Sequence, residues 1–217
     1  MRARARARAC LTAVSFVLFV ATTEAIAQGP NTGADARKDV GNAEAQYHGG
    51  VVTPPLPKPQ FTLTDTSGAR FNFRSKTDGY VTLLFFGYTH CPDVCPMQMY
   101  YLSKALKKMP KEVADRFRVV FVTTDPDRDN PDRLRQWLDQ FHNNFVGLTG
   151  SDAEIRIAEQ AANVPPGKGK PSYDHSAFVI AYTTDNLAHV IYPYGIGEED
   201  WLHDLPQLAR ETWTAAR

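Results

Sequence analysis

Two apolar runs limit the fold of this 217-residue chain more than any other feature. They are VTLLFFGY at residues 81–88 and RVVFVTT at residues 118–124. Near-continuous apolar runs are typical of strands that are buried on both faces, as in a parallel sheet covered by helices. A pattern with helical periodicity lies between them, from Met97 to Met109, and stops at Pro110. The sequence therefore predicts an α/β domain with a partly parallel sheet.

The segments around these runs complete the layout. FTLTDTSGARFNF at 61–73 alternates apolar and polar positions about a turn at Ser67 and Gly68, which predicts an N-terminal β-hairpin. The other expected elements are a helix from Pro131 to Phe141 capped by Asn130, a short strand or loop at 145–148, a helix from its cap Ser151 to about Ala162, a hairpin of 176–182 and 187–194, and a helix from Glu198 to about Trp213 interrupted near Pro206. With a cysteine pair directly after the first long strand, this order predicts a thioredoxin-like fold with a mixed central sheet, flanking helices and an N-terminal β-hairpin.

The first 27 residues have the pattern of an export signal. Four arginines precede an apolar run at 10–21, and Ala25-Ile26-Ala27 follows as a signal peptidase site. The alternative is an uncleaved N-terminal anchor, but a bilayer span needs about 20 apolar residues and this run has 12. We expect a cleaved signal and a periplasmic or exported protein, which would stay at the outer face of the inner membrane if the signal is not cleaved.

Residues 28–59 are rich in Gly, Asn, Ala and Pro and lack apolar periodicity, which predicts a flexible tether before a domain at 60–217. Loss of the signal removes four of 24 basic and one of 24 acidic residues, leaving 20 against 23. A net charge near −3 does not favour nucleic acid or an anionic membrane surface as a partner.

Cleavage also removes Cys10, so that Cys91 and Cys95 are the whole thiol chemistry of the exported chain. Each precedes a proline, and the residue before proline avoids the α region. We therefore expect neither cysteine inside a helix, with Pro96 as the first helical residue and Cys95 at the cap. The helix N-terminus would lower the thiol pKa there and make Cys95 a ready thiolate.

A non-helical loop would let the pair close as a disulfide or open as a dithiol. Two thiolates with an imidazole select copper strongly and zinc less exclusively. His175, at the entry to an apolar strand, is either that imidazole or a hydrogen-bonded histidine at a strand end. Asp125 leaves the second apolar run at the edge where open α/β sheets bind ligands, and for it a functional and a purely structural role are equally favoured.

Other residues nearby invite weaker interpretations. We expect Asp127, Asp129 and Asn130 only to stabilise a helix start. His90 should have a structural role, since a side chain next in sequence on extended backbone points away from Cys91. Core packing is expected for both methionines of the following helix, Met97 and Met99.

Five ordered motifs of this sequence resemble the Sco/SenC family of copper-binding, thioredoxin-fold proteins that serve cytochrome c oxidase assembly. They are GYTHCPDVCP (87–96), TDPDRDNP (124–131), GLTG (147–150), YDHS (173–176) and YPYG (192–195), and the likeness extends from about Pro59 to Leu208. The resemblance implies metal ligands at Cys91, Cys95 and His175, with Asp125 as an acidic neighbour of the metal site.

The leading hypothesis is thus a metallochaperone that binds one copper ion, Cu(I) or Cu(II), and passes it to the copper-site subunit of cytochrome c oxidase. Other periplasmic copper or thiol-redox proteins are further candidate partners. The alternative is a thiol-disulfide oxidoreductase using Cys91 and Cys95 as a redox-active pair, either on the oxidase cysteines or in redox defence. Three residues between the cysteines weaken its analogy with the usual redox motif. A purely structural disulfide is the third hypothesis.

Overall fold

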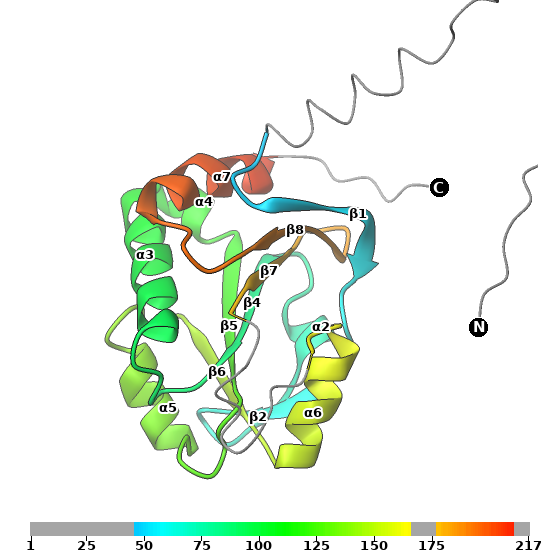
Figure 1. The fold of residues 1–217 in the computed structure, drawn as a ribbon, viewed down its shortest axis with the longest axis vertical. Coiled ribbons are helices and arrows are strands. Elements are labelled where there is room, and N and C mark those ends of the chain that lie inside the picture. The colour runs from blue at the N-terminus through cyan, green and yellow to red at the C-terminus, as the bar shows by residue number, and fades with distance from the viewer. Residues whose placement is uncertain (1–45, 166–176, 211–217) are drawn as a thin grey trace, which may run out of the picture.

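A mixed eight-stranded sheet forms the centre of the computed structural model, which describes residues 46–165 and 177–210. Its strand order is β1-β8-β7-β4-β5-β6-β2-β3 (Figure 1). The strands are β1 (Gly50–Pro57), β2 (Thr62–Asp65), β3 (Arg70–Asn72), β4 (Val81–Gly87), β5 (Phe117–Thr123), β6 (Val146–Thr149), β7 (Val179–Tyr182) and β8 (Leu187–Tyr192). β4, β5 and β6 run parallel, whereas β7 runs antiparallel to β4. This topology confirms the predicted mixed sheet.

Helices cover both faces of the sheet. They are α2 (Phe73–Lys76), α3 (Val94–Lys108), α4 (Lys111–Ala114), α5 (Pro131–Leu138), α6 (Asp152–Ala161) and α7 (Glu198–Arg210). Figure 1 shows α3 and α5 on one side of the sheet and α6 on the other. The core is divided accordingly, because buried side chains of α3, α5 and α7 form one cluster and those of α2 and α6 another. The sequence did not predict the short helices α2 and α4.

The apolar run of β4 has no polar face because both of its faces are covered. Leu83 and Phe85 belong to the cluster under α3, whereas Leu84 and Phe86 belong to the cluster under α6. All four side chains are at most 2% exposed. Side chains alternate between the two faces of a strand, so a strand between two helical layers needs apolar residues at every position.

The predicted hairpins and helix caps are present. β2 pairs with β3 and β7 with β8, both antiparallel. Asn130 caps α5 by accepting the backbone N–H of Arg133 at 2.9 Å, with Pro131 in the first turn. Ser151 caps α6 in a reciprocal capping box with Glu154. The α5 helix ends at Leu138, three residues before the expected Phe141.

The predicted tether is wrong for residues 50–57. These residues form β1, an edge strand that pairs antiparallel with β8, for example at Gly50 and Ile191. Proline is compatible with an edge strand because one side of the strand needs no ladder hydrogen bonds. The sequence did not predict β1 because its side chains are exposed or half-buried, so the strand lacks the alternation of apolar and polar residues that marks a half-buried strand. Residues 28–45 of the expected tether lie outside the described residues.

The expected interruption of the last helix is also wrong over the described residues. α7 continues through Pro206 to Arg210. Proline removes one intrahelical hydrogen bond, but Trp201, Leu205 and Leu208 are almost fully buried on the same helix. This tertiary packing keeps α7 helical on both sides of the proline. The expected end near Trp213 lies outside the described residues.

No helix within 46–165 and 177–210 is both long and apolar enough to span a bilayer. The predicted signal, residues 1–27, falls outside these ranges.

Candidate metal centre

The two cysteines lie where the chain leaves β4 and enters α3. Both are reduced cysteines, with Cys91 half-buried and Cys95 fully buried. The backbone N–H of Cys95 donates to the sulfur of Cys91 at 3.3 Å, and the two thiols are themselves hydrogen-bonded. The structure thus brings together two soft ligand atoms at the carboxyl end of a buried parallel strand.

The expected helix start is wrong, because α3 begins at Val94 and includes Cys95. Asp93 is its N-cap residue and Pro96 lies in the first turn. The N–H groups of a first turn have no intrahelical acceptor, so proline there loses no hydrogen bond. The avoidance of the α region before proline is a steric preference rather than a prohibition, and Cys95 is helical in spite of it. Cys91 remains outside the helix, as expected.

The expectation that Cys95 is a ready thiolate is wrong as well. The hydrogen bond to Cys91 raises the pKa of the Cys95 thiol above its ordinary value, and burial raises it further. It is instead the sulfur of Cys91 that accepts an N–H of the first helical turn. The Asp93 side chain makes no capping hydrogen bond. The positive end of α3 therefore favours negative charge on Cys91 rather than on Cys95.

Gly87 makes room for the buried thiol. A Cβ atom at this position would lie 2.8 Å from the sulfur of Cys95 and 2.8 Å from the ring of Phe85. Such contacts are too short for any side chain, so the end of β4 requires glycine. Packing therefore makes the glycine at position 87 a requirement for the buried position of Cys95.

A buried carboxylate, Asp129, holds the loop that precedes Cys91. One of its oxygens accepts the backbone N–H of Thr89 at 2.8 Å and the hydroxyl of Thr123 at 2.7 Å, and the other accepts the hydroxyl of Thr89 at 2.6 Å. His90 also faces it, with Nδ1 3.6 Å from a carboxylate oxygen. This agrees with a structural role for His90.

Sequence reasoning assigned Asp129 only to a helix start and missed this function. Its partner Thr89 lies 40 residues away in the sequence. No local pattern signals a contact over that separation, so only the assembled sheet reveals it.

Asp125 is buried at the end of β5 and its carboxylate pairs with Arg128. The backbone N–H of the preceding residue, Thr124, donates to the carbonyl of Gly87 at 2.7 Å. This hydrogen bond ties the start of the Asp125 loop to the start of the cysteine loop. The structure therefore places Asp125 on the neighbouring strand end, as the sequence predicts.

His175, the third predicted ligand, lies outside the described residues. The next element is described, and β7 begins at Val179, which pairs with Phe85 near the end of β4. The chain therefore enters β7 beside the strand end that leads to the cysteines.

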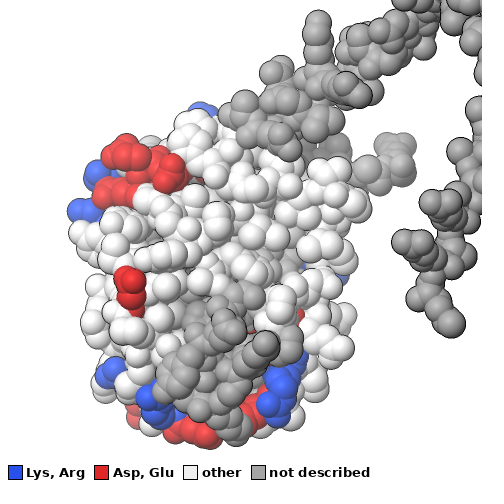
Figure 2. All heavy atoms as spheres, in the orientation of Figure 1, with Lys and Arg blue, Asp and Glu red and all other residues white. Residues whose placement is uncertain are grey.

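The surface next to the cysteine loop carries exposed apolar and aromatic side chains. Tyr194 is 51% exposed and its hydroxyl donates to Asp93, the N-cap residue of α3. Met97 and Tyr100 of α3 are 36% and 46% exposed. The expected core packing is confirmed for Met99, which is fully buried, but is wrong for the partly exposed Met97. On the face of the molecule that Figure 2 shows, charged side chains gather towards the edges, including acidic groups where α7 begins.

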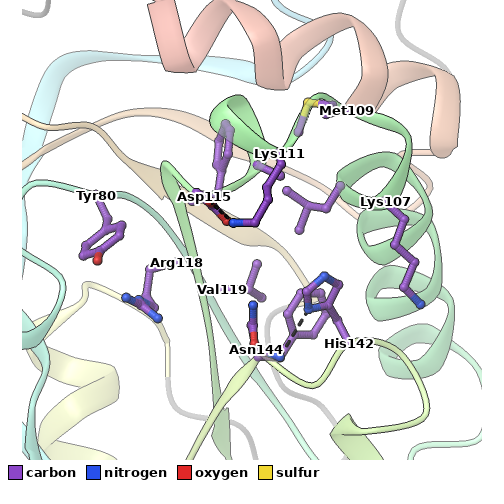
Figure 3. A pocket seen from close by; sticks show the side chains of 13 residues that line it. Tyr80, Lys107, Met109, Lys111, Asp115, Arg118, Val119, His142 and Asn144 are labelled. Atoms are coloured by element: carbon purple, nitrogen blue, oxygen red, sulfur yellow. Dashed lines mark hydrogen bonds and ion pairs between the residues drawn. The ribbon is translucent and has the colours of Figure 1, made fainter.

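A separate cavity of about 590 Å³ is lined from β5, the end of α3, α4 and the loop after α5. Figure 3 shows Arg118, Lys111, Lys107 and His142 around it. The three cations among them already have partners, since Arg118 stacks on Tyr80, Lys111 pairs with Asp115, and Lys107 donates to a backbone carbonyl. Neither cysteine lines this cavity.

Comparisons with known proteins agree with the fold. Residues 53–210 match the family model described as SCO1/SenC. An SCO2-like protein of Rickettsia conorii is 36% identical over 125 residues, which cover 54% of this chain and 60% of that protein. The chain spans between about a third and three fifths of the length of the curated relatives that it matches.

Solved structures include apo Sco1 of Thermus thermophilus, with 32% identity and a TM-score of 0.64 over 75% of this chain and 96% of that one. They also include ScoI of Bradyrhizobium japonicum with copper bound, with 32% identity and a TM-score of 0.61 over 70% of this chain and 99% of that one. These similarities confirm the predicted thioredoxin-like fold.

Proposed function

Because this chain belongs to the SCO1/SenC family, we propose that it is a copper metallochaperone that acts in cytochrome c oxidase assembly. It binds one copper ion through Cys91, Cys95 and His175 and delivers the ion to the binuclear copper site of the oxidase. The observation that carries this proposal is the adjacent pair of reduced thiols in the loop and helix start that follow β4. Two thiolates and an imidazole form a soft ligand set that suits copper, and a related protein has been solved with copper bound.

The register of β7 supports His175 as the third ligand. Val179 pairs with Phe85, two residues before the glycine that ends β4. His175 precedes Val179 by four residues, and four residues of extended chain reach at most about 14 Å. The chain length thus permits the imidazole to meet the sulfurs without any rearrangement of the sheet.

The unequal burial of the two thiols suits metal transfer by ligand exchange. Cys91 is half-buried, whereas Cys95 is 0% exposed. An incoming thiolate of the recipient would bind the metal as the bond to Cys91 breaks, with Cys95 the last ligand to leave. The apolar surface formed by Tyr194, Met97 and Tyr100 offers the recipient a place to dock.

Asp125 is proposed as an acidic neighbour of the metal rather than a ligand. Its carboxylate is buried and pairs with Arg128, so its negative charge is partly balanced before any metal arrives. Breaking that ion pair would let Asp125 compensate the charge of a bound cation as the ligand set changes.

We place the activity outside the cytoplasm. The predicted signal at residues 1–27 would export the chain to the periplasm or beyond. An oxidising compartment means that the pair must be reduced before it can bind copper, since a disulfide offers no thiolate.

The decisive experiment measures copper affinity of the exported protein and of single ligand variants. Cys91→Ala, Cys95→Ala and His175→Ala should each lower the affinity for Cu(I) by at least about tenfold, since loss of even an outer-shell partner costs that much. His90→Ala serves as the control, because His90 faces Asp129. Full affinity in the His175→Ala variant would disprove the three-ligand site. Transfer of copper to an apo oxidase copper domain by a variant lacking both cysteines would disprove the chaperone function.

The same preparation separates the chaperone from the oxidoreductase alternative. In that alternative Cys91 would attack the disulfide and Cys95 would resolve the mixed disulfide, and the three residues between the cysteines weaken its analogy with the usual redox motif. Reduction of an oxidase-derived disulfide peptide that survives His175→Ala and requires both cysteines would favour the oxidoreductase instead.

A further inference from the structure

We propose that His48 and His203 form a second metal site, for a divalent ion such as Cu²⁺ or Zn²⁺, where the segment before β1 meets α7. One candidate ligand atom from each of His48, His203 and Asp204 lies within 4.8 Å of the other two. The first histidine precedes β1 and the others belong to α7. The site shares no residue with the cysteine centre.

The two imidazoles are already arranged side by side. Their ring centroids are 4.1 Å apart and the ring planes differ by 13°. Two nitrogens bound tetrahedrally to one zinc ion lie about 3.3 Å apart, given bonds of about 2.0 to 2.1 Å. Both side chains are 44% exposed. Because a metal ion lies in the plane of each imidazole that binds it, the two rings must rotate out of their stack to share an ion, and their partial exposure leaves room for that rotation.

A carboxylate fixes each ring through its Nδ1 atom. Nδ1 of His48 lies 2.6 Å from an oxygen of Asp200, and Nδ1 of His203 lies 2.6 Å from an oxygen of Asp204. Such a partner orients a histidine and leaves Nε2 as the metal-binding nitrogen. The amide nitrogen of the neighbouring Gln207 lies 3.2 Å from Nδ1 and 3.5 Å from Nε2 of His203 and donates to the carbonyls of Gln46 and His203. Rotation of this amide would exchange those hydrogen bonds for contact of its oxygen with the ion.

The backbone of the site is held independently of the imidazoles. Asp204 is fully buried and accepts the backbone N–H groups of His48 and Gly49, at 2.9 and 3.1 Å. Asp200 also accepts the N–H of Gly197 at 2.8 Å. The segment before β1 is thus pinned to α7 before any ion binds, and the ion would add a second link between them.

The ligand atoms determine the class of ion. Imidazole nitrogens with carboxylate or amide oxygens suit Cu²⁺ and Zn²⁺, with Cu²⁺ bound more tightly, whereas Cu⁺ prefers thiolates. The chain would then hold Cu⁺ at the cysteines that follow β4 and Cu²⁺ at the two imidazoles beside α7.

The test uses the exported protein without a histidine tag, in a Cys91→Ser, Cys95→Ser, His175→Gln background. This background removes every ligand of the proposed copper centre, so the result does not depend on that proposal. We expect it to bind one Cu²⁺ per chain, with nitrogen hyperfine splitting in the electron paramagnetic resonance spectrum. Adding His48→Gln or His203→Gln should lower the Cu²⁺ affinity by about tenfold or more.

Two further variants complete the design. Asp200→Asn retains both imidazoles and should give a smaller loss of affinity, as a weakened orienting partner does. His142→Gln is the control, because His142 lies in the loop after α5 and lines a different cavity. Absence of Cu²⁺ binding in the background variant, or equal affinity in the His48→Gln, His203→Gln and His142→Gln variants, would overturn the second site.

Discussion

The two cysteine thiols differ in accessibility and in the groups that surround them. Cys91 is half-buried and receives an N–H from the first turn of α3, whereas Cys95 is fully buried against Gly87 and donates to Cys91. A thiolate is the reactive form of cysteine. We therefore expect Cys91 to be the more reactive thiol and Cys95 to be protected by burial.

Alkylation rates test this difference. In the reduced, folded protein at neutral pH, iodoacetamide should modify Cys91 about tenfold or more faster than Cys95, because burial and the hydrogen bond to Cys91 raise the Cys95 pKa. Peptide mass spectrometry of samples quenched at early times measures both rates. In guanidinium chloride the two rates should converge. Equal rates in the folded protein would contradict the assigned environments.

For single residues, the sequence identified the members of the cysteine loop more successfully than it predicted the role of each. The proline rule placed both thiols outside the helix, but a first-turn proline loses no hydrogen bond and Cys95 is helical. The roles of Gly87 and Asp129 arise from contacts with Cys95 and Thr89. Such contacts exist only once the loop has folded against the strands, so local patterns could not predict them.

Among the elements, β1 is where sequence patterns and structure differ most. None of its side chains is fully buried. Its position depends on pairing with β8 and on the hydrogen bond between the preceding residue, Gly49, and Asp204 of α7. The strongly apolar β4 and β5 were predictable because burial on both faces leaves a continuous signal. An edge strand has no such signal, since one row of its hydrogen-bonding groups and many of its side chains face solvent.

Two adjacent glycines at the start of β1 allow its contact with β8 to be tested. A Cβ at Gly49 would lie 2.4 Å from Cγ1 of Val190 and 2.7 Å from the ring of Tyr192, whereas a Cβ at Gly50 would meet nothing closer than 3.7 Å. Gly49→Ala should lower the free energy of unfolding by about 1 to 3 kcal/mol, the usual cost of overpacking. Urea denaturation of both variants measures the effect.

Gly50→Ala is the matched control and should change the free energy of unfolding by less than about 0.5 kcal/mol. Neither glycine has a positive φ angle, so backbone strain does not separate them. Equal destabilisation by the two substitutions would show that β1 does not pack on β8 as closely as described.

Across the whole molecule, the proposed copper centre and the second metal site lie on different connections of one sheet. The cysteines follow β4, at the edge where open α/β sheets bind ligands. The histidine pair joins the segment before β1 to α7, which Figure 1 shows at one end of the molecule. The sequence predicted the first centre because its ligands follow recognisable motifs. It left His48 and His203 unassigned because 155 residues separate them and no motif joins them.

A buried lysine makes global stability depend on pH. Lys58 follows β1 and is 1% exposed, with Nζ donating to the carbonyl of Thr77 at 3.1 Å and the hydroxyl of Thr82 at 3.2 Å. Burial lowers the pKa of Lys58 from 10.5 to about 8, although Asp78 opposes the shift. Between these two values the unfolded chain binds more protons than the folded chain, so the free energy of unfolding rises with pH.

Replacement of this lysine should remove that dependence. From pH 7 to pH 9, the wild type should gain about 1 kcal/mol of stability relative to Lys58→Met, because the folded chain no longer holds a buried charge once Lys58 loses its proton. Urea denaturation of both proteins at several pH values measures the difference, and the comparison cancels titrations that both share. A difference that stays constant from pH 7 to 9 would mean that Lys58 keeps an ordinary pKa, and that water reaches its ammonium group.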